Sequence, residues 1–329
     1  PFPNLFNTPD MFFKINRLRG AWAWVLLVAS LSTASAQQRP EIEIRSRWVN
    51  CTSLEINAEK HTQGSYTVLL VFTERQNTRQ PPTFKTVMRG STQSLLTVKP
   101  IQPEQPVGCA YRYHYIRGYH APKLDSGFVY RLPYSVHRDK PVRARPLFDL
   151  RERYFDGKPA RGWSAWQFLL AEGDTVFAMR KGTVVEVHDG ETPAQAGLQS
   201  TYRSKENSVL VEHPDGTLGR YTVLDNGTIT VREGEVVFPG TPIAQAGTYY
   251  EGGERQVRVC VYFPDENPAF RGNASTNVSA FEWVYYNPWF ATSEGPRQLV
   301  DLGTYTAVCA PELVQREMTK KEIKAHPEL

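Results

Sequence analysis

The feature that most constrains the fold is a run of short apolar segments separated by glycine turns. Residues 217–247 read TLGRYTVLDNGTITVREGEVVFPGTPIAQAG. Glycine adopts the positive φ angles that tight turns require, and β-branched or aromatic residues between such turns favour strands over helices. The stretch therefore predicts consecutive short strands joined by tight turns.

The same pattern extends to both sides of this stretch. Residues 40–135 contain the strand-like segments EIEIRSRWV, SYTVLLVFTE, SLLTVKP and GCAYRYHYIRGYH, which predict a β-sandwich of immunoglobulin-like type. Residues 160–265 contain a second set, including the hairpin NSVLVEHPDGTLGRYTVL, which turns at Pro214-Asp215-Gly216. One helix is predicted near the C-terminus, in PELVQREMTKKEIKAH. We therefore expect an all-β chain with a short C-terminal helix.

The length of 329 residues suits two modest domains. The segment HRDKPVRARPLFDLRER is basic, contains proline and has no hydrophobic period, which is typical of a linker. The expected parts are an upstream leader (1–10), a signal peptide (11–36), a β-sandwich domain (37–136), a linker (137–158), a second β domain (159–290) and a tail with the helix (291–329).

The N-terminal residues have the composition of a secretory signal. Met11 is the only methionine before residue 88, and basic residues follow it, then the apolar run AWAWVLLVASLSTA and the sequence Ala34-Ser35-Ala36. This order matches a signal peptide with its cleavage site, and the apolar run is too short to span a bilayer comfortably. We expect an exported protein, periplasmic or extracellular, whose mature chain starts near Gln37 and has no membrane span.

The net charge of +4 is small for this length. Binding to nucleic acid normally leaves a concentrated basic patch in the sequence. We therefore expect no nucleic-acid partner.

Four cysteines, an even number, suit disulfides in an exported protein. Three pairings are open, and the simplest joins Cys51 to Cys109 and Cys260 to Cys309, within each half of the chain. Free buried thiols are the alternative. Cys260 also shares a strand face with Arg258, because side chains alternate along a strand. The charge of Arg258 would favour the thiolate, so a nucleophilic role for Cys260 is a further alternative.

Residues 160–265 resemble the lysostaphin-type (LytM) zinc endopeptidases, which cut peptide cross-links in bacterial peptidoglycan. The family's V-x-I-x-H-x-D/N-G hairpin corresponds to VLVEHPDG, and its Y-x-H-L motif corresponds to YTVL. Its glycine pattern V-x-x-G-x-x-V-x-x-G-x-x-I-x-x-x-G corresponds to VREGEVVFPGTPIAQAG, in register at every glycine. Its closing H-x-H-F-E-V strand corresponds to QVRVCV. The resemblance implies an antiparallel β hybrid barrel of the LytM type.

The resemblance also implies a zinc site, and this chain differs from the family at each of its positions. The family's zinc ligands fall on Trp163, Gln167 and Arg258, and its catalytic histidines fall on Val223 and Gln256. Zinc is bound by imidazole, thiolate or carboxylate groups, and none of these residues supplies one. We therefore expect no catalytic residue, no bound metal and no cofactor.

Three functions stay open at this level. The first is a pseudo-peptidase that binds a cell-envelope peptide, peptidoglycan or a partner protein without hydrolysis, with Trp163, Trp166, Gln256 and Arg258 as candidate binding residues. The alternative role for the two tryptophans is to fill the vacated metal cavity as core. The second function is an active zinc metalloendopeptidase acting on peptidoglycan cross-links, with zinc as cofactor and ligands at other positions. The third is a structural envelope protein whose N-terminal sandwich does the binding.

Overall fold

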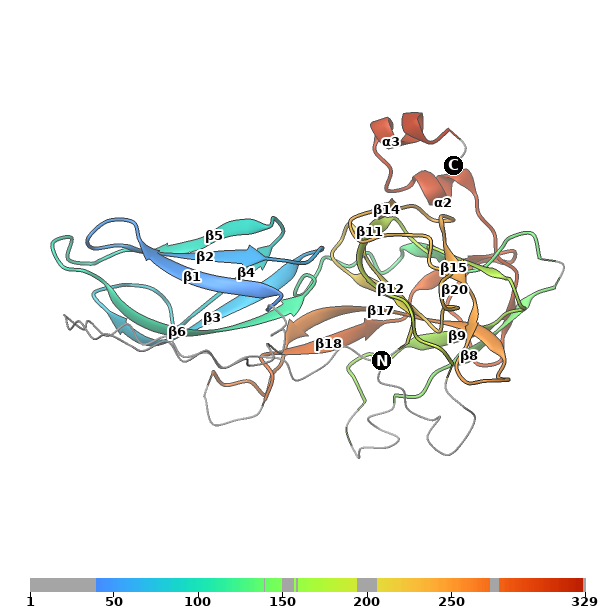
Figure 1. Ribbon diagram of the computed structural model, residues 1–329, viewed down its shortest axis with the longest axis horizontal. Helices are drawn as coiled ribbons and strands as arrows, with labels where there is room; N and C mark the ends of the chain where they lie inside the picture. The colour runs from blue at the N-terminus through green and yellow to red at the C-terminus, as the bar shows by residue number, and fades with distance from the viewer. Residues whose placement is uncertain are drawn as a thin grey trace, which may run out of the picture. The chain divides into compact units, whose positions relative to one another are not determined.

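The computed structural model describes residues 40–138, 140–149, 157, 159–193, 206–272 and 278–327. The leader and signal peptide expected over residues 1–36 lie outside this range. The chain divides into two compact units, both drawn in Figure 1. The smaller unit contains the described part of Thr8–Thr62 together with Val68–Tyr115, and the larger unit contains Gln63–Thr67 and the described part of Ile116–Leu329.

The strands of the smaller unit form two three-stranded sheets within the described residues. One sheet has the order β1 (Ile42–Trp48), β2 (Leu54–Lys60), β5 (Thr92–Val98), and the other has the order β4 (Thr83–Met88), β3 (Tyr66–Gln76), β6 (Gly108–Arg117). Leu54, Ile56 and Ala58 of β2 are buried and the residues between them are half-buried, as the two-residue period of a strand requires. The all-β class is confirmed, and the immunoglobulin-like topology of this unit stays a prediction.

The larger unit is built on one sheet that has ten strands in the part of the chain described here. Its main path is β14 (Val236–Val237), β11 (Gly182–His188), β12 (Ser208–Glu212), β13 (Leu218–Thr222), β17 (Arg255–Glu266), β9 (Ala165–Leu169), β8 (Val142–Pro146) and β21 (Thr304–Tyr305). β16 (Gly247–Thr248) and β18 (Phe281–Tyr286) also pair with β17. Smaller sheets join β10 (Thr175–Phe177) to β15 (Pro242–Gln245), and β20 (Gly295–Arg297) through β19 (Trp289–Thr292) to β7 (Val129–Arg131).

Strand β8 lies inside the range 137–158, where the sequence predicted a linker. Val142 and Ala144 are buried and Arg143 between them is exposed, so the segment alternates as a half-buried strand does. β8 pairs with β9 and β21. An alternation this short within a basic, proline-containing segment was not recognised, because only the pairing with distant strands makes it a strand.

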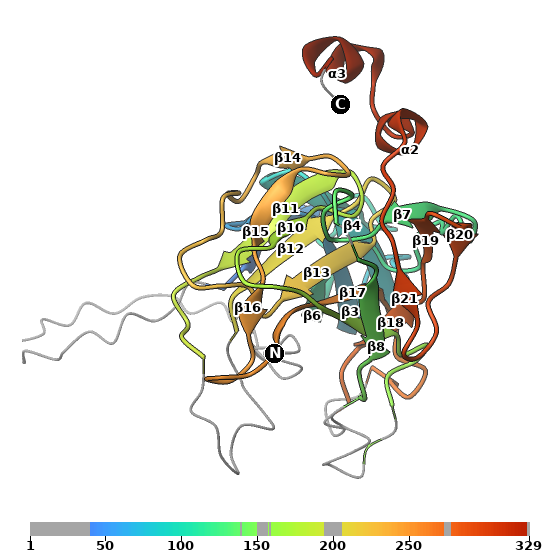
Figure 2. The same cartoon turned by 90° about the vertical axis from the view of Figure 1, so that its right-hand side faces the viewer.

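Two short helices replace the single C-terminal helix expected from the sequence. They are α2 (Pro311–Gln315) and α3 (Lys320–Ala325), shown at the red end of the ribbon in Figure 2. Thr319 is the N-cap of α3 and forms a capping box with Glu322. This cap starts a new helix, because its backbone is extended and its side chain accepts the backbone N–H of Glu322. None of the described helices is long and apolar enough to cross a membrane.

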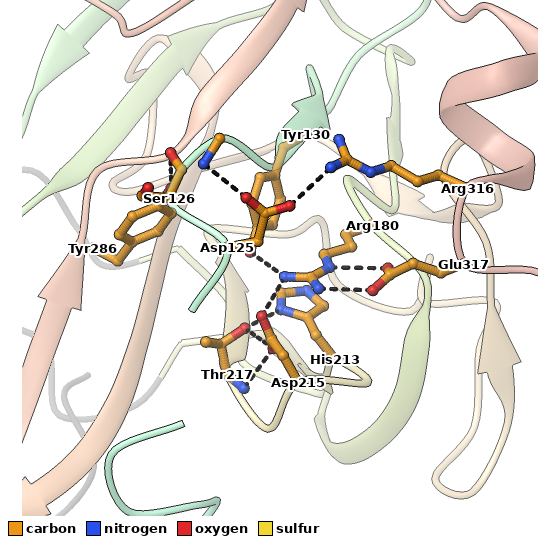
Figure 3. A network of polar contacts seen from close by, with 11 residues as sticks. Asp125, Ser126, Tyr130, Arg180, His213, Asp215, Thr217, Tyr286, Arg316 and Glu317 are labelled. Carbon is orange, nitrogen blue, oxygen red and sulfur yellow. Dashed lines mark hydrogen bonds and ion pairs between the residues drawn. The ribbon is translucent and has the colours of Figure 1, made fainter. Parts of the chain in front are cut away.

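A buried arginine connects these helices to the body of the larger unit (Figure 3). Arg180 is buried and donates hydrogen bonds to Glu317, Asp215 and the hydroxyl of Tyr130. The next residue, Lys181, donates to the carbonyl of Glu317 at 2.9 Å. The segment between α2 and α3 is therefore anchored mainly by charged groups.

Candidate functional site

A row of polar side chains crosses four neighbouring strands of the large sheet. It consists of Thr222 on β13, Arg258 on β17, Gln167 on β9 and Arg145 on β8, each directly opposite the next in the antiparallel pairing. Side chains that lie directly opposite in such pairs share one face of the sheet, with Cβ atoms roughly 5 Å apart. We call these four residues the polar row.

The burial of neighbouring residues shows which face of the sheet carries the polar row. All four members of the polar row are half-buried. The residues beside them in the strands, including Val257, Val259 and Phe168, belong to the main hydrophobic core. Because successive side chains in a strand point to opposite faces, the polar row lies on the face turned away from that core.

Arg258 is held by two buried neighbours. Its Nε donates to Oε1 of Gln256 at 2.9 Å, and the centre of its guanidinium lies 4.0 Å from the ring centroid of Tyr249. Gln256 and Tyr249 are both buried. A guanidinium has five N–H donors, and the four on Nη1 and Nη2 have no hydrogen-bond partner among the described residues. The orientation of Arg258 is therefore set while most of its donors stay open.

Gln167 is the direct cross-strand neighbour of Arg258. Its side-chain amide makes no hydrogen bond to any described residue, and the residue is half-buried. An amide offers two N–H donors and one oxygen acceptor. Two of the three positions at which the resemblance implies zinc ligands therefore lie side by side.

Val223 follows directly after β13 and has an unusual backbone. It is buried and has a φ of +62°, an outlier for a β-branched residue that costs on the order of 1–3 kcal/mol. Its carbonyl accepts a hydrogen bond from Gly247, which pairs with Gln256. Val223 and Tyr249 line a cavity of about 10 Å³, which is room for about one water molecule. The two positions of the implied catalytic histidines are therefore close together.

The two candidate tryptophans do not belong to the polar row. Trp166 is buried in the main core, on the face opposite to Gln167, and its Nε1 lies 3.3 Å from Oδ1 of Asn287. It is therefore part of the core, which is the alternative role that the sequence left open for the two tryptophans. Trp163 is half-buried and packs at a ring distance of 4.6 Å on Tyr285, while its Nε1 donates to the carbonyl of Leu147 at 2.7 Å.

The residues at the implied zinc positions do not fit a zinc ion. Arg258 carries a positive charge at the place of one ligand, and Trp163 uses its ring N–H as a donor. Zinc requires electron-pair donors such as imidazole or carboxylate. Among the residues that the structure describes, no group of three or more His, Cys, Asp or Glu side chains is arranged to hold a metal ion.

His188 and His213 lie outside the polar row. His213 is buried, its Nδ1 is 2.8 Å from the hydroxyl of Thr217, and burial together with the charge of Arg180 lowers its pKa to about 3. His188 lies 3.2 Å from a carboxylate oxygen of Glu191 at the end of β11. His213 is therefore a neutral structural residue of the hairpin.

All four cysteines have free thiols in this structure, so neither expected disulfide is present. Cys260 lies on β17 beside the cluster that includes Trp163, and burial raises its pKa to about 12, which opposes a nucleophilic role because the thiolate is the reactive form. Cys309 is exposed and lies near Gly240. Val107 donates to the carbonyl of Thr52 at 3.0 Å and brings the segments of Cys51 and Cys109 together, so that bridge stays a prediction.

Sequence reasoning missed three residues of the site. Thr222 and Arg145 enter the polar row only through strand pairing, and Tyr249 reaches Arg258 from the turn after β16. Arg145 lies in the segment that was expected to be a linker. No local signal distinguishes these residues, since their neighbours are far away in the sequence.

One segment of the chain matches a protein-family model. Residues 161–264 match the model described as Peptidase family M23. No curated protein matches the chain.

Solved structures also show likeness to this chain. A putative glycyl-glycine endopeptidase LytM from Ruminococcus gnavus ATCC 29149 is 14% identical with a TM-score of 0.28, over 42% of this chain and 54% of that one. A zinc-containing peptidase from Vibrio cholerae is 14% identical with a TM-score of 0.27, over 67% and 81% of the two chains. Csd3 from Helicobacter pylori is 11% identical with a TM-score of 0.25, over 88% and 77%. The chain thus spans about half the length of the first of these structures. TM-scores this low show nothing about its activity.

Proposed function

We propose that the M23-type domain of this chain, residues 161–264, binds a cell-envelope peptide, peptidoglycan or a partner protein without hydrolysing it. The protein would then be an exported pseudo-peptidase. The chemical class of its ligand follows from the family of the domain, and the absence of hydrolysis follows from the residues at its site.

The observation that carries the proposal is the cross-strand pair of Arg258 and Gln167. A guanidinium and an amide lie where the family has two zinc ligands. A bound zinc would supply the activated water of a metallopeptidase. The positive guanidinium of Arg258, at the position of a zinc ligand, would repel the zinc ion. Val223 and Gln256 cannot shuttle protons, and general acid–base catalysis is typically worth about 10²–10⁴ in rate.

Export is part of the same proposal. It rests on the basic, apolar and small-residue order over residues 11–36. The mature protein would act in the periplasm or outside the cell, where peptidoglycan is accessible. N-terminal sequencing of the exported protein should begin near Gln37, and a chain that retains residues 11–36 would contradict export by cleavage.

The test of the function uses the purified mature chain. Elemental analysis should find no stoichiometric zinc, and incubation with peptidoglycan or oligoglycine peptides should release no new amino termini, with or without chelator. The protein should co-sediment with insoluble peptidoglycan or capture an envelope protein. Arg258→Ala should weaken this binding, whereas Arg232→Ala, at an exposed position, should not. One zinc per chain together with hydrolysis that a chelator abolishes would replace this proposal by the active-peptidase alternative.

One observation supports the third function, binding by the N-terminal unit. The surface of β1, β2 and β5 contains an open cavity of about 600 Å³. Its lining includes Glu43, Arg45, Arg47, Asn57, Glu59 and Ser94. Arg45→Ala in the full chain separates the two functions, since loss of binding in this variant, with Arg258→Ala unaffected, would assign the ligand to the smaller unit.

A further inference from the structure

We propose that the polar row is an anion-binding site, and that Arg258 and Gln167 together bind a free carboxylate of a peptide ligand. This inference rests on the proposed function and names the group that the domain recognises. It also adds Thr222, Arg145 and Tyr249 to the residues that form the site.

The hydrogen-bonding groups of the polar row are mainly donors. The polar row contains two guanidiniums, one amide and one hydroxyl, and no carboxylate. Such groups are mainly donors, and two of them carry a permanent positive charge. A zinc site consists of acceptors with lone pairs. The strands that would position lone-pair ligands for zinc in the family therefore position hydrogen-bond donors in this chain. Such a site favours an anion, whereas a zinc site binds a cation.

The two arginines of the polar row differ in their carboxylate neighbours. Arg145 already has a carboxylate neighbour, since its Nη1 lies 3.2 Å from Oε2 of Glu254, whose side chain is exposed. Arg258 has no carboxylate partner among the described residues. Its open Nη1 and Nη2 groups match the two oxygens of a carboxylate, which a guanidinium binds in a bidentate manner. Arg258 is therefore the centre of the site and Arg145 its outer member.

The side chain of Arg258 is preorganised for binding. The contact with Tyr249 and the hydrogen bond to Gln256 hold the guanidinium of Arg258 before any ligand arrives. A side chain that is already ordered loses less conformational entropy on binding. Gln256 and Tyr249 are thus positioning residues, and Gln167 lies one strand away with its amide open.

The length of the polar row limits the size of the ligand. Neighbouring strands lie about 4.8 Å apart, so four strands span roughly 15 Å. An extended peptide covers about 3.3–3.6 Å per residue, so about four residues would cross the row. A short peptide with its carboxylate at Arg258 and its backbone directed toward Thr222 or Arg145 fits these dimensions.

The experiment uses the mature full chain and soluble muropeptides as the probe, with their carboxylates either free or converted to methylamides. Isothermal titration should show binding of the free form and about tenfold or more weaker binding of the amidated form, because the bidentate ion pair is lost. Arg258→Lys should weaken binding about tenfold, because it keeps the charge and loses the planar fork. Arg232→Lys, at an exposed position, is the matched control and should change the affinity less than twofold.

Gln167→Glu gives a sharper test. The new carboxylate would lie opposite Arg258 and occupy its donors, so binding should fall about 100-fold while the midpoint of urea unfolding stays the same or rises. Gln245→Glu makes the same change at an exposed position of β15 and should leave binding within twofold of the parent chain. The unfolding midpoints show that both variants are folded.

The possible outcomes separate this inference from the proposed function. If the parent chain binds muropeptides equally well with free and amidated carboxylates, and Gln167→Glu binds as tightly as the parent, the anion site is refuted while a non-hydrolytic binding function stands. If the parent chain binds neither muropeptides nor peptidoglycan, both proposals fail for this ligand class.

Discussion

Arg180 and Glu317 form a two-point salt bridge in the larger unit, with Nε 2.9 Å from Oε2 and Nη2 2.7 Å from Oε1 (Figure 3). The guanidinium of Arg180 also lies 3.8 Å from the ring centroid of Phe128. This pair joins the turn between β10 and β11 to the segment between α2 and α3. It makes the C-terminal segment part of the folded unit.

Glu317→Gln should therefore destabilise the larger unit. Removing one partner of a buried ion pair costs about 3–5 kcal/mol, and we expect about 3 kcal/mol because Asp215 still contacts Arg180 at 2.8 Å. Urea unfolding of the full chain measures the change. Glu294→Gln is the control, since Glu294 is 72% exposed in its pair with Arg297 and should cost less than about 1 kcal/mol. Equal effects of the two substitutions would contradict the anchoring role.

The stability of the larger unit should fall in mild acid because His213 stays neutral when folded. Its pKa is about 3 in the fold, through burial and then the charge of Arg180, against an ordinary value of 6.5. Below pH 6.5 the unfolded chain binds a proton that the folded chain does not, so stability decreases as the pH falls from about 6.5 toward 3. Between pH 8 and 5 this amounts to about 2 kcal/mol.

Urea unfolding at pH 8 and pH 5 checks this pH dependence. His213→Gln should be less stable than the parent at pH 8, because it loses the contact with Thr217, but its stability should change less between the two pH values. An equal change in both chains would show that other groups cause the acid sensitivity.

The four thiols should differ in reactivity when the protein is reduced. Cys51 and Cys309 are exposed, whereas burial raises the pKa of Cys109 and raises that of Cys260 to about 12. Iodoacetamide reacts with the thiolate, so mass spectrometry after brief labelling at pH 7.5 should find Cys51 and Cys309 modified first. Cys260 should react only after denaturation. Rapid labelling of Cys260 in the folded protein would show that β17 is more accessible than in this structure.

Introducing a histidine at Val223 should not produce peptidase activity. Val223→His places an imidazole beside the small cavity at Tyr249, but the positive charge of Arg258 remains. We expect no stoichiometric zinc by elemental analysis and no hydrolysis of oligoglycine peptides. Measurable chelator-sensitive hydrolysis by this variant would mean that the protein binds zinc through other residues.

The predicted strands near 217–247 and the family resemblance are confirmed, since residues 161–264 match the M23 model and glycine turns separate β13, β15 and β17. The strand at 142–146 lies where the sequence predicts a linker, and the burial of Trp166 agrees with the core role that the sequence left open beside ligand binding. The residue type alone does not tell whether a tryptophan packs in the core or lies on a binding surface. Which face it occupies is decided by the register of β9 against β17.

The sequence by itself determined the all-β class of fold and the resemblance to the M23 family. Glycine turns and alternating apolar residues act locally, and residue identity alone gives a guanidinium at Arg258 and an amide at Gln167. The tertiary structure decided what these residues do together. Pairing of β13, β17, β9 and β8 brings Thr222, Arg258, Gln167 and Arg145 into one row, because hydrogen bonds between strands join residues that are far apart in the chain.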